Sequence, residues 1–157
     1  MLVDTVIMYT DGSARGNPGP GGYGVVLMYK GHRKELAAGY KLTTNNRMEL
    51  LAVIIGLEAL KRKDLNVKIY SDSKYVVDAV EKGWLWNWEA KDFKKKKNVD
   101  LWKRYIPLHR ALNIEFHWVK GHASIPENER CDELAVKASF EKNLHVDEGY
   151  EQDIRSI

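Results

Sequence analysis

Cysteine is nearly absent from this chain, and long apolar runs are missing altogether. The 157 residues contain a single cysteine, Cys131, so no disulfide can form within the chain and nothing indicates an oxidising compartment. No apolar stretch approaches the roughly 20 residues that a membrane-spanning helix needs. The first residues, 1–5, lack the basic and apolar regions of a secretory signal. These absences predict a cytoplasmic protein without a membrane partner.

Internal repeats, low-complexity segments and linkers are missing as well. Hydrophobic residues make up 44% of the chain and charged residues 30%, which is typical of one globular domain with its own core. Nothing in the pattern requires an obligate oligomer, so we expect a monomer.

The net charge of +3 is small, but its distribution along the chain is uneven. Residues 82–104 contain eight basic and three acidic side chains, so this one segment holds the whole positive excess. A basic segment of this kind favours a nucleic-acid partner.

The hydrophobic pattern predicts three strands, at about residues 3–11, 23–30 and 33–41, joined by a glycine-rich turn at 16–22 and a short turn at 30–32. Tight connections between consecutive strands form an antiparallel meander. The following pattern predicts helices over 47–62, 74–82, 99–111 and 126–142, and strands over 67–71 and 114–119. Alternating helices and strands favour parallel pairing. We therefore expect an α/β fold whose mixed five-stranded sheet, a meander plus two parallel strands, is flanked by helices. This domain spans 1–142, and the acid-rich tail at 143–157 lacks a clear period and is expected to be poorly ordered.

Four carboxylates stand near the ends of these predicted elements: Asp11, Glu49, Asp72 and Asp132. Each one alone has an ordinary explanation. Asp11 precedes a glycine in a turn, Glu49 fits a capping box with Asn46, Asp72 or its neighbour fits a helix cap, and Asp132 fits an exposed helix position. Taken together they favour a site, because open α/β sheets carry their sites at the carboxyl ends of strands.

Four acids around one point repel one another strongly unless divalent cations neutralise them. Carboxylate oxygens select Mg²⁺ or Mn²⁺, and the absence of a Cys/His cluster argues against zinc. Two such ions can promote hydrolysis of a phosphodiester without a protein nucleophile.

Six runs of residues then carry a resemblance to a known family. They are Tyr-Thr-Asp-Gly-Ser at 9–13, Gly-Asn-Pro-Gly-Pro-Gly-Gly-Tyr-Gly at 16–24, Thr-Thr-Asn-Asn-Arg-Met-Glu-Leu at 43–50, Ser-Asp-Ser at 71–73, Val-Lys-Gly-His at 119–122 and Pro-Glu-Asn-Glu-Arg-Cys-Asp-Glu-Leu-Ala at 126–135. In this order they resemble type 1 ribonuclease H of bacteria over roughly residues 4–142. The resemblance implies the ribonuclease H-like fold and an endoribonuclease that cuts the RNA strand of RNA–DNA hybrids with two Mg²⁺ ions, for which Mn²⁺ substitutes. It also implies products with 3′-hydroxyl and 5′-phosphate ends.

The same resemblance implies a role for each catalytic residue. Asp11 matches the acid that bridges both metal ions. Glu49 and Asp72 match ligands of the ion on the leaving-group side, and Asp132 matches a ligand of the ion that activates water. His122 matches a loop histidine that assists proton transfer or product release. As a lone residue it would be read as a solvent-facing loop histidine.

Substrate contacts follow from the resemblance too. Asn17, Asn45 and Asn46 resemble the family's RNA-strand contacts, and amide side chains can read both faces of a 2′-hydroxyl. One of Asn45 and Asn46 also fits a helix N-cap. Thr44 resembles part of a pocket for a DNA-strand phosphate, although Leu42 stands where many members carry arginine.

The basic segment resembles the family's protrusion that packs tryptophans and lysines against the DNA strand. Trp84, Trp88, Lys95 and Lys96 are the expected contacts there. Gly83 adds one residue before the aromatic cluster, so the choice among Trp84, Trp86 and Trp88 stays open.

Two alternative functions are separable by experiment. A binding module for hybrids or double-stranded RNA would use the same surface without cutting, but it has no need of four acids facing a polyanion. A resolvase- or integrase-like enzyme would prefer DNA duplexes, and such enzymes typically lack a Trp/Lys protrusion.

Overall fold

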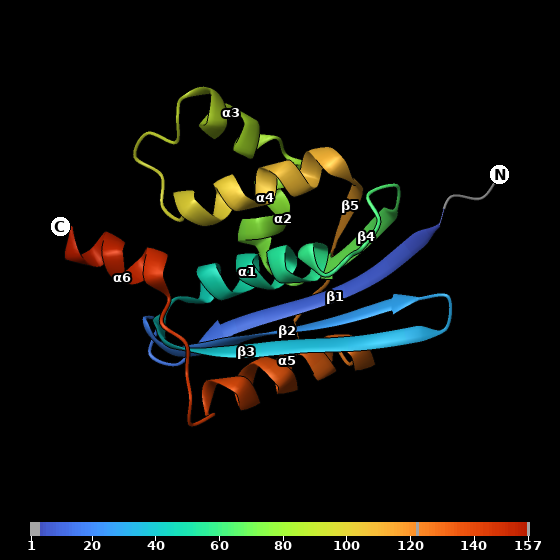
Figure 1. Ribbon diagram of the computed structural model, residues 1–157, viewed down its shortest axis with the longest axis horizontal. Coiled ribbons are helices and arrows are strands. Elements are labelled where there is room, and N and C mark those ends of the chain that lie inside the picture. The colour runs from blue at the N-terminus through green and yellow to red at the C-terminus, as the bar shows by residue number, and fades with distance from the viewer. Residues whose placement is uncertain (1–3, 122, 157) are drawn as a thin grey trace.

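The computed structural model describes residues 4–121 and 123–156. Within these residues, five strands form one mixed sheet in the order β3-β2-β1-β4-β5 (Figure 1). The strands are β1 (Thr5–Ala14), β2 (Gly19–Tyr29), β3 (His32–Thr43), β4 (Asn66–Ser71) and β5 (Asn113–Trp118). β1, β2 and β3 pair antiparallel, while β4 pairs parallel with both β1 and β5. The predicted meander and the two parallel strands are both confirmed.

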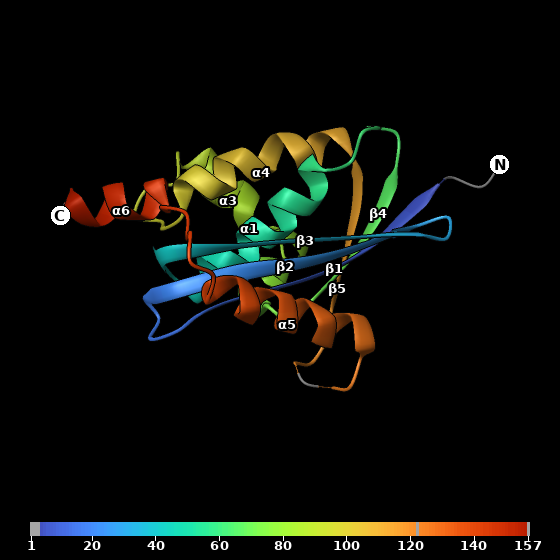
Figure 2. The same cartoon turned by 60° about the horizontal axis from the view of Figure 1, so that its bottom comes forward.

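Helices cover both faces of this sheet. They are α1 (Asn45–Glu58), α2 (Lys74–Glu81), α3 (Trp84–Ala90), α4 (Val99–Ala111), α5 (Pro126–Ser139) and α6 (Glu148–Arg155). α1 and α4 lie on one face and α5 on the other, as Figures 1 and 2 show. α1 is apolar around most of its circumference and is almost wholly buried between the sheet and α4. Its Leu50 and Ile54 belong to a continuous core with Met8, Ile69 and Trp102.

α5 approaches the sheet closely because glycines face it. A Cβ atom at Gly24 would overlap the carbonyl oxygen of Cys131, and one at Gly39 would overlap the carbonyl oxygen of Ala138. Backbone therefore packs on backbone here, a use of glycine that any larger residue would prevent. This contact fixes the height of α5, the helix that carries Asp132, above β2 and β3.

Several predicted boundaries were wrong. The first strand continues past Asp11 to Ala14, and the second begins at Gly19 inside the predicted turn, because Ala14 pairs with Gly21 across the two strands. The helix predicted over 47–62 begins at Asn45 and ends at Glu58, and the helix predicted over 126–142 ends at Ser139.

The segments on either side of α4 also differ from prediction. Within the basic segment, Trp84–Ala90 forms the helix α3, which was not predicted. The tail is not poorly ordered, because residues after 143 add a bridge between Tyr40 and His145 and then form α6. Along the part of the chain that the structure covers, no helix has both the length and the apolar character needed to cross a membrane.

Candidate active site

Asp11 lies where β1 loses one of its two neighbours. Pairing of β1 with β4 ends at Tyr9 and Tyr70, whereas pairing with β2 continues through Asp11 and Gly24. Asp11 therefore lies beside the end of the β1–β4 ladder, but inside β1 and not at the strand end that the sequence predicted. It is buried, with 7% of its surface exposed, and its Oδ1 accepts a hydrogen bond of 2.8 Å from the Gly12 amide.

Glu49 comes to this point from α1. The helix is capped by Thr44, whose Oγ1 accepts a bond from the Arg47 amide at 3.2 Å, so the predicted cap at Asn45 or Asn46 was wrong. A Cβ atom on Gly12 would overlap the main chain of Met48 and Glu49. Glycine at position 12 thus lets the first turns of α1 lie directly against β1, which places Glu49 beside Asp11.

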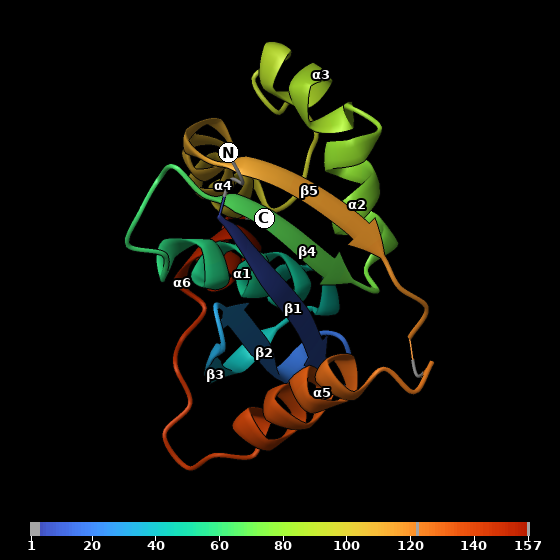
Figure 3. The same cartoon turned by 90° about the vertical axis from the view of Figure 1, so that its right-hand side faces the viewer.

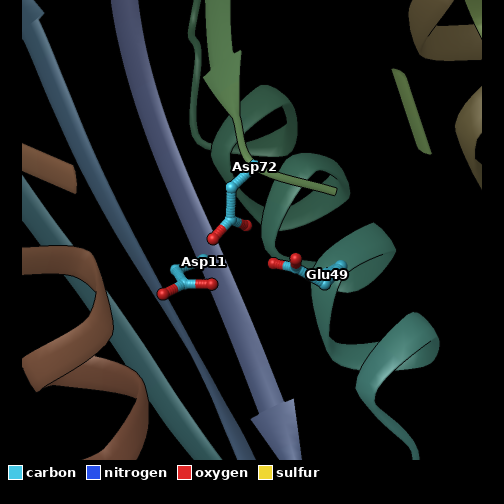
Figure 4. Close-up of side chains that lie close together, drawn as sticks. All are labelled: Asp11, Glu49 and Asp72. Atoms are coloured by element: carbon cyan, nitrogen blue, oxygen red, sulfur yellow. The ribbon is translucent and has the colours of Figure 1, made fainter. Parts of the chain in front are cut away.

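Asp72 follows β4 directly and precedes α2. Ser73, not Asp72, caps α2, because its side chain accepts a hydrogen bond of 3.2 Å from the Val76 amide. The main chain of Asp72 is held by Trp118 at the end of β5, whose indole N–H donates to the Asp72 carbonyl oxygen at 3.1 Å. The Asp72 carboxylate therefore does not cap α2, and it is turned toward Asp11 of β1 (Figure 4). Figure 3 shows β1 and β4 running side by side toward this end of the sheet.

These three carboxylates form one cluster, and Figure 4 shows their side chains pointing toward one another. One oxygen of each lies within 4.8 Å of one oxygen of the other two. Glu49 Oε1 is buried and has no hydrogen-bond partner among the described residues. A buried acceptor without a donor is costly, and a divalent cation would satisfy it. Three hard oxygen donors at this spacing fit Mg²⁺ or Mn²⁺.

The pKa shifts within the cluster also favour a bound cation. Burial and the charge of Asp72 raise the pKa of Asp11 from 3.8 to about 7. Burial and the charges of Asp11 and Asp72 raise the pKa of Glu49 well above its ordinary range. Both shifts arise because negative charge is concentrated and desolvated, and a bound cation would oppose them.

The remaining predicted catalytic residues are Asp132 and His122. Asp132, on α5, is close enough for its charge to raise the pKa of Asp11, but it is not one of the three acids that gather within 4.8 Å. His122 lies outside the described residues.

The asparagines predicted to contact substrate hold loops together. The amide oxygen of Asn17 accepts a bond from the Asn45 amide nitrogen of the main chain at 3.0 Å, and the amide oxygen of Asn45 accepts one from the Ala14 N–H at 2.6 Å. Asn46 is exposed at the start of α1. The structure thus gathers Asn17, Thr44, Asn45 and Asn46 along one edge, next to the turn of α1 that carries Glu49.

The predicted protrusion is formed by α3 and the connection to α4. Trp84 is 42% exposed, whereas Trp86 and Trp88 pack inward against His109 and Trp102. The ammonium of Lys96 lies 5.1 Å from the centre of the Trp88 ring, and Lys95 is exposed beside it. Buried Phe93 anchors the connection to the core.

Sequence reasoning missed two groups near the site. Trp118 donates a hydrogen bond to the Asp72 main chain. The Lys74 ammonium lies 4.2 Å from the centre of the Trp118 ring. α6 was missed as well, although Asp147 caps it, Glu148 and Glu151 lie in its first turn, and Arg155 lies in its last turn. That charge order is a helix signature that the sequence does contain.

Known proteins resemble this chain over most of its length. The sequence model of the RNase H family matches residues 4–140. A ribonuclease H of Desulforamulus reducens is 59% identical over 147 residues, covering 90% of this chain and 92% of that protein. A ribonuclease H of Rippkaea orientalis is 53% identical over 151 residues, covering 93% of this chain and 92% of the relative.

Two solved structures extend the comparison to the fold. LC9-RNase H1, described as a type 1 RNase H with the type 2 active-site motif, is 32% identical with a TM-score of 0.79, covering 97% of this chain and 81% of that chain. LC11-RNase H1, solved in complex with an RNA/DNA hybrid, is 30% identical with a TM-score of 0.64, covering 85% of this chain and 95% of that chain.

Proposed function

Because this chain belongs to the ribonuclease H family, a family of nucleases, we propose that it hydrolyses the RNA strand of RNA–DNA hybrids endonucleolytically and leaves 3′-hydroxyl and 5′-phosphate ends. The observation that carries the proposal is the convergence of Asp11, Glu49 and Asp72 within 4.8 Å. The structure of LC11-RNase H1 with an RNA/DNA hybrid supports the choice of substrate.

The acidic cluster would hold divalent cations, which we propose to be two Mg²⁺ ions, with Mn²⁺ as a substitute. Such ions supply Lewis-acid stabilisation to the attacking and leaving oxygens of an in-line displacement. Asp11, which faces Glu49 and Asp72 and also feels the charge of Asp132, is assigned to both ions, and Asp132 is assigned to the water-activating side.

The reaction forms a bond between a water oxygen and phosphorus and breaks the bond between phosphorus and the 3′-oxygen. The water loses a proton and the 3′-oxygen gains one. His122 is assigned to carry protons near this site. The buried position of Glu49 limits water access on the α1 side, which strengthens the electrostatic effect of the cluster.

Selection of the RNA strand is assigned to the asparagines around the start of α1. The Asn17 and Asn45 amide oxygens bind main-chain N–H groups, so each side chain still has an NH₂ group that can donate to a 2′-hydroxyl. Thr44, Trp84, Trp88, Lys95 and Lys96 are assigned to the DNA strand.

A cleavage assay with end-labelled RNA–DNA hybrid tests the proposal. Wild-type protein should cut the RNA strand in Mg²⁺, EDTA should abolish cutting, and added Mg²⁺ should restore it. Asp11→Asn should lower the rate at least about a thousandfold, since charge stabilisation of this kind contributes several kcal/mol.

The same assay can contradict the proposal. Cutting of the DNA strand, preference for a DNA duplex, or hybrid binding without metal-dependent cutting would each reject it. Glu133→Gln, which removes an exposed carboxylate from α5, is the matched control and should retain full activity.

We also propose that the protein acts as a cytoplasmic monomer. Light scattering should return a mass near 18.1 kDa, and a stable dimer would contradict this.

A further inference from the structure

A cavity of about 480 Å³ joins α6 to the residues predicted to bind substrate. Its lining includes Asn17, Thr44 and Asn45 around the start of α1, Lys97 of the basic segment, and Tyr150, Asp153 and Ile154 of α6. Figures 1 and 2 both place α6 beside the start of α4, at the end of the molecule away from the start of β1. The C-terminal segment is thus a wall of this groove.

α6 is fixed in this position by contacts to the core of the domain. The Asp147 carboxylate, which caps α6, accepts hydrogen bonds from Arg47 Nε at 2.8 Å and from the Thr43 hydroxyl at 2.7 Å. Asp147 is 6% exposed and Arg47 3% exposed. Just before it, the His145 main chain bonds to Gly39 and Lys41 of β3. A wall held by a buried ion pair can contribute to binding without first having to order itself.

The lining of the groove suits a sugar–phosphate backbone. Lys97 offers a cation, Thr44 a hydroxyl, and Asn17 and Asn45 their amide NH₂ groups, which have no recorded partners among the described residues. Tyr150 and Ile154 add an aromatic and an apolar surface on which sugars can pack. Asp153 is the one acid in the lining, and its charge opposes a phosphate.

The groove lies at the start of the helix that carries Glu49. Thr44 and Asn45 begin α1, and Glu49 follows one turn later on the same helix. A duplex whose scissile phosphate lies at Asp11 and Glu49 would therefore extend its backbone past these residues toward α6.

We propose that α6 is part of the hybrid-binding surface, with Tyr150 and Ile154 packing against the sugar–phosphate backbone and Asp153 weakening the hold on it. This inference rests on the proposed function, since the occupant of the groove is the same RNA–DNA hybrid. It adds residues of the C-terminal segment to the residues that determine affinity.

Binding of a fluorescein-labelled RNA–DNA hybrid, followed by anisotropy, tests the inference. The measurements use Asp11→Asn protein, so that the hybrid stays intact. Tyr150→Ala should raise the Kd about five- to tenfold, the lower range for loss of an aromatic contact to nucleic acid. Asp153→Asn should lower the Kd about three- to fivefold at low salt. Glu148→Gln removes the same charge from the same helix, outside the groove lining, and should change the Kd by less than the Asp153 variant.

The active forms of these variants separate binding from structure. Tyr150→Ala should raise KM and leave kcat unchanged, whereas general damage to the fold would lower the unfolding temperature and kcat together. Tyr150→Phe, which keeps the ring, should retain most of the affinity.

Equal Kd values for Asp153→Asn and Glu148→Gln, together with an unchanged Kd for Tyr150→Ala, would overturn the inference. The proposed function would survive that result as long as wild-type protein cuts hybrids. If wild-type protein fails to cut or bind hybrids, the proposed function fails first and this inference fails with it.

Discussion

The position of Asp11 is electrostatically unfavourable for a charged carboxylate. The residue is buried among other acids, which raises its pKa from 3.8 to about 7, and the pKa of Glu49 is raised in the same direction. Such carboxylates bind protons more tightly in the native state than in the unfolded state. Without metal, the cluster therefore reduces stability near neutral pH.

Metal-free wild-type protein should lose stability as the pH rises from about 4 to about 7. This interval lies between the ordinary pKa of Asp11, which applies in the unfolded state, and its raised pKa in the folded state. Above the folded-state pKa the full penalty is present, and below the unfolded-state value it is absent. Asp11→Asn removes one of these charges and should raise the free energy of unfolding at pH 7.5 by about 1–3 kcal/mol. Urea unfolding in EDTA across this pH range measures the effect.

Glu141→Gln, at an exposed position after α5, should leave the pH profile of stability unaltered. Saturating Mg²⁺ should narrow the difference between wild type and Asp11→Asn, because only the wild-type cluster gains a strongly bound ion. A wild-type stability that is flat or rising between pH 4 and 7 would refute this account of the site.

At the scale of elements, α6 depends on one long-range ion pair. Arg47 reaches Asp147 through Nε at 2.8 Å and through Nη2 at 2.9 Å, and it also contacts Asp100 at 2.7 Å. The Asp147 side chain is 8% exposed and that of Asp100 is 47% exposed. Burial makes the first pair far more sensitive to loss of one partner than the second.

Asp147→Ala should lower the free energy of unfolding by about 3 kcal/mol, because it leaves the Arg47 charge buried and short of partners and removes the cap of α6. Asp100→Ala breaks the other contact of the same guanidinium and should cost about 1 kcal/mol or less. Urea unfolding of the two variants side by side provides the comparison. Equal losses would mean that burial does not set the strength of these pairs.

The sequence could predict the elements whose determinants are local, and the Arg47–Asp147 ion pair is a determinant that is not local. The sheet followed from local apolar patterns. Asp11 and Asp72 were expected together because the sequence predicted that their strands end at one edge, although β1 in fact continues to Ala14, and Glu49 joins them from α1. α6 has helical charge order, but its position depends on Arg47, 100 residues earlier in the chain, which no local pattern records.

The cap at Thr44 was missed because Asn45 and Asn46 are equally good capping residues by type. The distance of Asp132 from the other acids depends on how closely α5 packs on Gly24 and Gly39, which only the assembled sheet shows.

The whole molecule separates charge along its length. The +5 excess of residues 82–104 comes mainly from the lysine-rich connection between α3 and α4, with Lys82 before α3 and Lys103 and Arg104 in α4, while the rest of the chain is slightly acidic. Figure 1 shows these elements standing out on the α1 side of the sheet. A polyanion would thus be attracted to one side of the protein, and the cluster of acids would be approached only where that attraction holds the duplex in place.

Salt dependence tests this separation. Neutralisation of about four phosphates predicts a slope of roughly −3 to −4 for log K against log salt when Asp11→Asn protein binds a hybrid. The double variant Lys95→Ala/Lys96→Ala should reduce the magnitude of that slope by about 2, since each lysine displaces about one counterion. Lys34→Ala/Lys63→Ala removes the same charge from exposed positions outside the protrusion. If the attraction depended on net charge alone, both double variants would change the slope equally. A larger change for the Lys95 and Lys96 variant would mean that the location of these lysines in the protrusion decides where the duplex binds.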